Sequence, residues 1–93
     1  MSSADRKKAL LIVNPFAGRM RSRNGLFDIV DLFSKNGYEI TVHVTSKRGD
    51  AVEFLEKISC DYSVVMCCGG DGTLNEVVTG MMKLPAVMPI GYI

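Results

Sequence analysis

The segment of the sequence best suited to chemistry is a run of three glycines around one carboxylate, Gly69-Gly70-Asp71-Gly72-Thr73. A continuous apolar stretch precedes it and helical apolar spacing follows it, so it should connect a buried strand to a helix. Glycines let a phosphate approach the backbone without meeting a Cβ atom. The N–H groups and partial positive charge at the start of the next helix attract anions. The segment therefore predicts a phosphate-binding loop.

Asp71 conflicts with this prediction unless it has a cationic partner, because a carboxylate repels a phosphate. A magnesium ion between the two groups resolves the conflict, since proteins often hold magnesium by one or two carboxylates together with phosphate oxygens. The alternative is that Asp71 only stabilises its own turn. We interpret Asp71 as the candidate catalytic residue, acting through magnesium, and as the candidate metal ligand.

The loop differs from two well-known phosphate-binding motifs. The sequence contains no G-x-x-x-x-G-K-[ST] P-loop. It also departs from the G-x-G-x-x-G motif of dinucleotide-binding folds, because Asn75 occupies the third glycine position. Such folds place an acidic residue at the end of the second strand, where this sequence has Thr45.

The elements that must position this loop alternate along the chain. Continuous apolar runs predict strands that are buried on both faces, and apolar spacing of i, i+3, i+4 and i+7 predicts the helices between them. In residues 38–45 apolar and polar residues alternate, which predicts a strand near a sheet edge with Ile40, Val42 and Val44 on its drier face. The expected strands are 9–13, 38–45, 62–68 and 89–93, and the expected helical stripes lie at 26–33, 52–58 and 74–81.

This order of elements is typical of the α/β class. It predicts a three-layer open parallel sheet of Rossmann-like type, with right-handed crossovers and helices on both faces. Ligands of such sheets bind at the carboxyl ends of the strands. Three loops are expected at those ends, at residues 14–23, 45–50 and 69–73.

Two helix starts have the spacing of a capping box, Asp50 with Glu53 and Thr73 with Glu76. Thr73 therefore has two candidate roles, as a cap or as a ligand of a phosphoryl oxygen. Capping is sufficient to explain Glu76. His43 has no partner in view along the sequence, and we expect it to be structural.

Length, composition and charge exclude several classes of protein. The 93 residues suffice for one small domain, with 47% apolar residues and a net charge of +1. Such a charge argues against strong attraction to nucleic acid or to an acidic membrane. The first apolar segment is too short for a signal peptide or a membrane span, so the cytoplasm is the expected location. Cys60, Cys67 and Cys68 are expected to be free thiols.

Basic residues occur in two of the three loops. Arg19, Arg21 and Arg23 alternate after the first strand, and Lys47-Arg48 follows the second. These side chains could contact nucleotide phosphates or anionic lipid headgroups at the inner membrane surface. The alternative is a solvated loop without a ligand.

Three motifs together resemble the diacylglycerol kinase catalytic domain family, which includes bacterial diacylglycerol kinases and sphingoid-base kinases. Residues 69–76 are similar to the signature of that family. Asn14-Pro15-Phe16-Ala17-Gly18 resembles its N-P-x-[SA]-G loop, with alanine where many relatives have serine. Thr45 followed by residues 49–51 resembles its second-strand motif. The G-G-D-G-T core is shared with NAD kinases and, ending in serine, with 6-phosphofructokinases. The extension at residues 74–76 and the loop after the first strand favour lipid kinases.

The resemblance implies an ATP-dependent lipid kinase of phospholipid metabolism that transfers the γ-phosphate of ATP to a lipid hydroxyl, such as that of diacylglycerol. It implies magnesium as cofactor and ATP and a lipid acceptor as partners. The basic loop residues leave peripheral membrane contact open, the net charge indicates no nucleic acid as partner, and a homo-oligomer stays open. By the same resemblance, the nucleotide-binding residues are Asn14, Pro15, Phe16, Ala17, Gly18, Thr45, Gly69, Gly70, Asp71, Gly72, Thr73, Leu74 and Asn75.

The resemblance also implies a second, β-rich domain that supplies the acceptor surface, a general base and further metal ligands. We therefore expect residues 1–93 to form the truncated N-terminal ATP-binding domain of a lipid kinase. We expect this domain by itself to lack kinase activity. Two alternatives stay open: a kinase of a soluble substrate, such as an NAD kinase, and a non-catalytic nucleotide-binding module. The lipid acceptor does not follow from this sequence.

Overall fold

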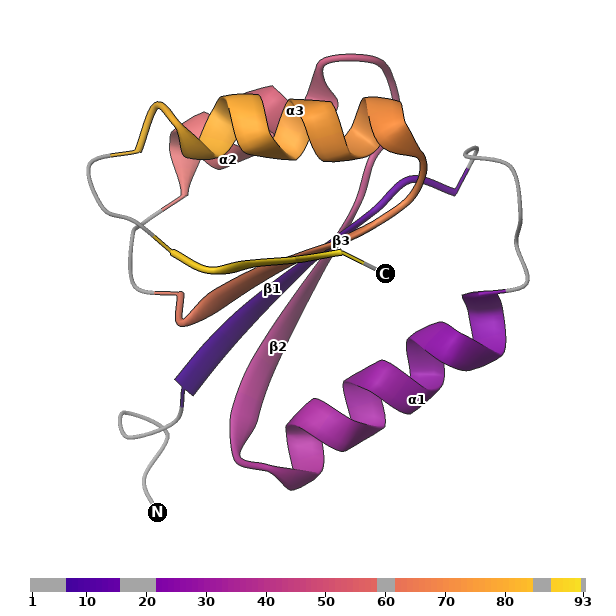
Figure 1. Cartoon of the computed structure of the whole chain (residues 1–93). Coiled ribbons are helices and arrows are strands. Elements are labelled where there is room, and N and C mark those ends of the chain that lie inside the picture. The colour runs from indigo at the N-terminus through magenta and orange to yellow at the C-terminus, as the bar shows by residue number, and fades with distance from the viewer. Residues whose placement is uncertain (1–6, 16–21, 59–61, 85–87, 93) are drawn as a thin grey trace.

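The computed structural model describes residues 7–15, 22–58, 62–84 and 88–92 (Figure 1). Strands and helices alternate through these residues. They are β1 (Lys7–Val13), α1 (Ser22–Lys35), β2 (Tyr38–Val44), α2 (Asp50–Lys57), β3 (Val64–Cys68), α3 (Asp71–Met81) and β4 (Ile90–Tyr92). All strand pairs are parallel, in the order β2-β1-β3-β4. The predicted α/β class with an open parallel sheet is confirmed.

The central strand β1 explains the three layers. Its residues from Ala9 to Val13 are buried, and successive side chains point to opposite faces of the sheet. Leu10 and Ile12 pack with α2 and α3, whereas Ala9, Leu11 and Val13 pack with α1. Figure 1 shows α1 on one side of the sheet and the other two helices on the opposite side.

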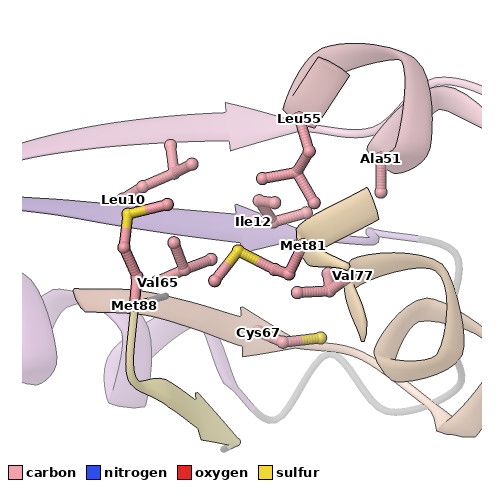
Figure 2. Packing of buried hydrophobic residues seen from close by; sticks show 9 residues of the cluster. All are labelled: Leu10, Ile12, Ala51, Leu55, Val65, Cys67, Val77, Met81 and Met88. Carbon is pink, nitrogen blue, oxygen red and sulfur yellow. The ribbon is translucent and has the colours of Figure 1, made fainter. Parts of the chain in front are cut away.

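The larger apolar cluster fixes α2 and α3 over the sheet (Figure 2). Leu55 comes from α2, while Val77 and Met81 come from α3. A Cβ atom on Gly80 would lie 2.8 Å from Leu55 Cδ1, so only glycine allows the two helices to approach this closely. Each fully buried side chain of this size contributes about 1.5–3 kcal/mol. The cluster therefore makes the two helices a stable support for the loops at their ends.

Strand β2 lies at the sheet edge, as expected, but the prediction for its drier face is wrong. Val42 and Val44 are 42% and 54% exposed. The apolar cluster under α1 includes Tyr38 and Ile40 but neither of these valines. On the other face, Thr45 just beyond the strand is buried. The alternation of apolar and polar residues predicted the strand correctly. How far a helix covers an edge strand depends on tertiary packing, which the alternation does not reveal.

Both capping-box predictions are wrong. Helix α2 begins after Gly49, which has φ of 87°, and α3 begins after Gly70 in an extended conformation. Neither helix start therefore has a side-chain capping hydrogen bond. Asp50 and Thr73 are already helical and bond more distant groups. The spacing of these residues is that of a capping box, but in the structure the side chains of Asp50 and Thr73 form hydrogen bonds with residues outside their own helices.

Two smaller expectations concern thiols and membrane spans. Cys67 and Cys68 are buried free thiols, as predicted, and Cys60 lies outside the described residues. Within the described parts of the chain, each helix is too short or too polar to cross a bilayer.

Candidate functional site

Three strands end at one edge of the sheet and place their following residues side by side. Val13 pairs with Val44 on one side and with Cys68 on the other. The pairing continues one residue further, because the Asn14 amide donates to Cys68 O over 3.0 Å and the Thr45 amide donates to Val13 O over 2.8 Å. Residues distant in the sequence thus meet at the carboxyl end of the sheet.

Asn14 and Thr73 join the first of these ends to α3. Asn14 Nδ2 donates a hydrogen bond to Thr73 Oγ1 over 3.0 Å, and Thr73 is 5% exposed. A Cβ atom on Gly69 would lie 2.8 Å from Thr73 Oγ1 and 2.9 Å from its Cβ. Glycine at position 69 is therefore needed to let the first turn of α3 pack against its own loop.

Gly72 differs from Gly69, although both belong to the same motif. A Cβ atom added to Gly72 would meet nothing within 4 Å. The residue is exposed in the first turn of α3, where backbone N–H groups have no partner within the helix. Its missing side chain leaves room for a ligand rather than for another part of the protein.

A cavity of about 280 Å³ lies between these ends and the two neighbouring helices. Its wall combines hydrogen-bonding groups, two basic residues and one carboxylate. The lining residues are Asn14, Thr45, Lys47, Arg48, Ala51, Gly72, Thr73 and Glu76. A cavity with positive side chains beside a helix N-terminus suits a phosphorylated ligand.

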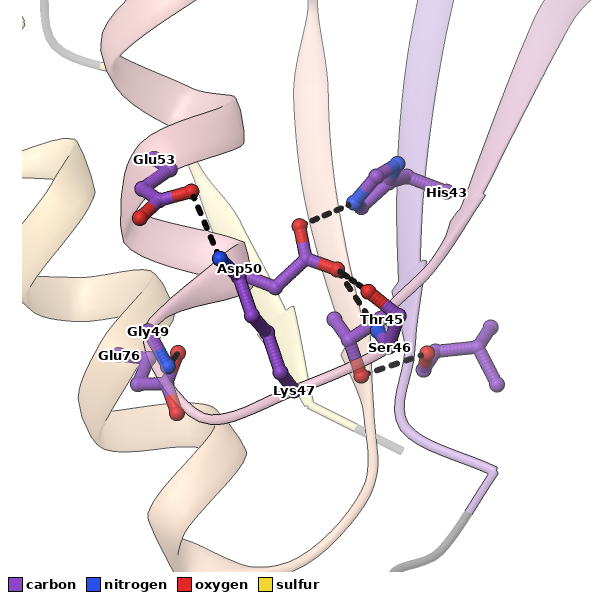
Figure 3. Close-up of polar contacts among 9 residues, drawn as sticks. His43, Thr45, Ser46, Lys47, Gly49, Asp50, Glu53 and Glu76 are labelled. Atoms are coloured by element: carbon purple, nitrogen blue, oxygen red, sulfur yellow. Dashed lines mark hydrogen bonds and ion pairs between the residues drawn. The ribbon is translucent and has the colours of Figure 1, made fainter.

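Asp50 holds the start of the loop between β2 and α2 (Figure 3). Its Oδ2 accepts hydrogen bonds from the Ser46 amide, over 2.7 Å, and from the Ser46 hydroxyl, over 3.0 Å. Its Oδ1 lies 3.0 Å from His43 Nε2, and the His43 ring stacks on Phe54 at 3.9 Å. The Ser46 amide first, and then His43, lower the pKa of Asp50 below its ordinary value. His43 is structural, as expected, but it has partners that the sequence did not reveal.

Glu76 holds the other end of this loop. Its Oε1 accepts a hydrogen bond from the Gly49 amide over 3.0 Å, which joins α3 to the residue before α2. Our sequence interpretation assigned Glu76 to capping and missed this contact. The sequence did contain a signal that Glu76 lies at the site, because it follows Thr73 by one helical turn and so lies on the same face of α3.

Comparison with known proteins identifies the family. The family model for the diacylglycerol kinase catalytic domain matches residues 8–93. The chain belongs to the diacylglycerol kinase catalytic domain family. A diacylglycerol kinase of Staphylococcus carnosus is 38% identical over 89 residues, covering 95% of this chain and 29% of that protein. The diacylglycerol kinase of Staphylococcus haemolyticus is 37% identical over 89 residues, covering 95% of this chain and 27% of that protein.

Solved structures agree with this membership. A crystal structure of a diacylglycerol kinase from Bacillus anthracis superposes with a TM-score of 0.76 at 26% identity, covering 96% of this chain and 33% of that chain. Another structure from the same strain gives a TM-score of 0.79 at 28% identity and covers 31% of that chain. The chain thus spans about 30% of the length of the diacylglycerol kinases it matches.

The residues assigned to nucleotide binding in this diacylglycerol kinase family member fall into three groups. Those that line the cavity are Asn14, Thr45, Gly72 and Thr73. Those that are described but do not line it are Pro15, Gly69, Gly70, Asp71, Leu74 and Asn75. Phe16, Ala17 and Gly18 lie outside the described residues, as do Arg19 and Arg21. Leu74 packs against the apolar cluster, so its side chain supports the fold.

Asp71 is the residue to test for magnesium. It is the first residue of α3 and is exposed. Among the described residues, no three carboxylate, histidine or cysteine side chains gather as a protein-only metal cage would require. One exposed carboxylate next to the cavity-lining Gly72 still fits magnesium, which proteins often hold by a single carboxylate together with substrate phosphates.

Proposed function

We propose that this chain supplies the nucleotide-binding part of an ATP-dependent diacylglycerol kinase, which transfers the γ-phosphate of ATP to a lipid hydroxyl. The observation that supports this best is the convergence of Asn14, Thr45 and Thr73 on one cavity. The cavity lies at the N-terminus of α3 and is bordered by Lys47 and Arg48. Family membership and the names of the relatives point to the same reaction.

The hydroxyl groups of the cavity have different capacities. Thr73 Oγ1 accepts from Asn14, so its own proton can be donated to a phosphoryl oxygen. Thr45 Oγ1 donates to Val13 O over 3.3 Å, which leaves its lone pairs to accept from a nucleotide N–H or O–H group. The threonine of α3 therefore suits a phosphate, whereas the threonine after β2 suits the nucleoside.

Charge neutralisation is the second contribution of this part of the protein. Phosphoryl transfer depends mainly on positioning and on countering the charge of the phosphates. The backbone N–H groups of the first turn of α3, Lys47 and Arg48 supply positive potential. Asp71 would hold magnesium, which adds charge neutralisation at the phosphates when it is bound.

We further propose that residues 1–93 form the N-terminal ATP-binding domain and that the acceptor surface and general base lie in the part of related kinases that this chain does not match. The chain by itself should then bind ATP without transferring phosphate. Transfer from labelled ATP to diacylglycerol or a sphingoid base by these residues alone, abolished in Asp71→Ala, would contradict this proposal.

The deciding experiment is an ATP titration of the 93-residue chain, with and without magnesium, followed by amide NMR shifts. We expect shifts at Asn14, Thr45 and residues 69–75. Asp71→Ala should weaken binding in the presence of magnesium and leave magnesium-free binding unchanged or stronger. Asp28→Ala is the matched control, because Asp28 is exposed on α1 at the opposite face of the sheet. The absence of shifts at the cavity residues would count against a nucleotide site in this chain.

A further inference from the structure

Two groups of cavity-lining residues come from distant parts of the sequence, and a hydrogen bond connects the segments that carry them. Gly72, Thr73 and Glu76 belong to α3, whereas Lys47 and Arg48 belong to the loop between β2 and α2. The Gly49 amide at the end of this loop donates to Glu76 Oε1 over 3.0 Å (Figure 3). The bond spans 27 positions in the sequence and is partly buried.

The loop is held at both ends and exposed in between. Asp50 accepts hydrogen bonds from Ser46 at the start of the loop, and Glu76 accepts one at its end. Lys47 and Arg48 are exposed, and the ammonium of Lys47 makes a loose ion pair with Glu53 at 3.9 Å. The two carboxylates therefore fix the backbone from which these two exposed basic side chains extend.

A carboxylate in the wall of a phosphate cavity needs an explanation. At this position its charge alone would repel a nucleotide phosphate. Gly49 offers the explanation, because its φ of 87° turns the backbone so that the amide meets Glu76. A hydrogen bond from an amide to a charged acceptor is stronger than one between neutral groups. The positioning effect can therefore outweigh the repulsion.

We propose that Glu76 is a positioning residue that fixes the 45–50 loop against α3, so that Lys47 and Arg48 face the bound nucleotide. This inference rests on the proposed function, since it assumes that the cavity takes ATP. It makes a prediction opposite to simple electrostatics: truncating this acidic side chain in a phosphate site weakens nucleotide binding instead of strengthening it.

The test compares three variants of the 93-residue chain. Glu76→Ala removes the acceptor, whereas Glu76→Gln keeps an acceptor oxygen and removes only the charge. Glu56→Ala is the matched control, because Glu56 on α2 pairs with Lys83 beyond α3 over 2.9 Å and lies outside the cavity lining. Hydrogen exchange of the Gly49 amide and heteronuclear NOE values of residues 46–48 report on the loop without ligand.

We expect Glu76→Ala to raise the exchange rate of the Gly49 amide and the Kd for ATP, each about tenfold. The NOE values of residues 46–48 should fall in the same variant. Glu76→Gln should keep the Gly49 exchange rate and the NOE values close to those of the wild-type chain and bind ATP at least as tightly. Glu56→Ala should stay close to the wild-type chain in all three measurements. Equal and tighter ATP binding by both Glu76 variants would overturn the proposal, because it would show that the residue acts only through its charge.

The two hypotheses fail in different ways. If the unmodified chain does not bind ATP, the proposed function fails, and the loop measurements on Glu76→Ala still decide whether Glu76 positions the loop. An unchanged Gly49 exchange rate in that variant overturns the positioning role even if ATP binds. Should Glu76→Ala not fold, Glu76→Asp, which keeps the charge on a shorter side chain, takes its place, and an unchanged Gly49 exchange rate in that variant contradicts the proposal.

Discussion

The side-chain amide of Asn14 lies 3.0 Å from the hydroxyl of Thr73, although 59 positions separate them in the sequence. This hydrogen bond joins the end of β1 to the first turn of α3. Two motifs that the sequence shows as separate signals are therefore parts of one polar unit at the edge of the sheet. The unit can be dissected by changing one atom at a time.

Replacing Thr73 by valine keeps the shape of the side chain and removes the hydroxyl. We expect Thr73→Val to lower the free energy of unfolding by about 1 kcal/mol, because Asn14 loses this buried acceptor. ATP binding should weaken in parallel. Thr73→Ser, which keeps the oxygen, should retain most of both properties. Urea unfolding curves and ATP titrations of the two variants make the comparison; equal losses in both would rule out the hydroxyl as the cause.

The two glycines of the motif should respond differently to alanine. In Gly69→Ala the new methyl group would press on the Thr73 side chain at 2.8 Å, so we expect a loss of about 1–3 kcal/mol in unfolding free energy.

Gly72→Ala, by contrast, has open space and a helical position, so its stability should stay the same or rise by up to about 1 kcal/mol. The same methyl group would occupy the room left for a ligand, so ATP binding should fall. Thermal unfolding with an ATP titration separates the two effects. A stable Gly69→Ala, or a Gly72→Ala chain that binds ATP normally, would contradict this assignment.

Asp50 should contribute stability that disappears in acid. Because its pKa is lowered in the folded chain, the contribution is fully present above the ordinary pKa of 3.8 and is lost as the pH falls below it, through the folded value. Asp50→Asn should therefore be less stable than the wild-type chain at neutral pH, and the difference should shrink below pH 3.8. Denaturant unfolding over a pH series measures the difference. Asp28→Asn, a change at an exposed position of α1, serves as the reference variant over the same pH series.

Cys67 should resist modification in the folded chain. Burial first, and then the neighbouring Cys68, raise the pKa of its thiol to about 11. At pH 8 only about one thiol in a thousand is then ionised, and the side chain is fully buried. Peptide mass spectrometry after brief iodoacetamide treatment should find Cys67 unlabelled in buffer and labelled in urea. Rapid labelling under native conditions would mean that β3 opens far more readily than its packing indicates.

The arrangement of elements could be predicted because it depends on side-chain periodicity, which is local. The runs ending at Val13 and Cys68 are apolar because both strands are covered on both faces. The exposure of Val42 and Val44 could not be predicted in the same way. It depends on where α1 stops covering the edge strand, which is a property of packing between elements.

The site was predictable to the extent that its residues follow the strand ends. The loops that carry Asn14, Thr45 and Thr73 were predicted because parallel strands bring their carboxyl ends to one edge, and the family resemblance pointed to these residues within the loops. The actual bonds of Asp50 and Glu76 were missed, since a capping-box spacing gives each carboxylate a satisfactory local partner. In the structure both accept hydrogen bonds from groups outside their own helices, which sequence spacing alone does not reveal.

The position of β1 at the centre of a parallel sheet also has a consequence for synthesis on the ribosome. Leu10 pairs with Thr41 on one side and with Val65 on the other, so both neighbours of the first strand are made after it. Until β3 has left the exit tunnel, the nascent chain carries an apolar strand with an unpaired edge. Such segments aggregate or recruit chaperones. Co-translational folding of this chain should therefore begin late, and pausing of translation before residue 68 should increase chaperone association rather than yield a folded intermediate.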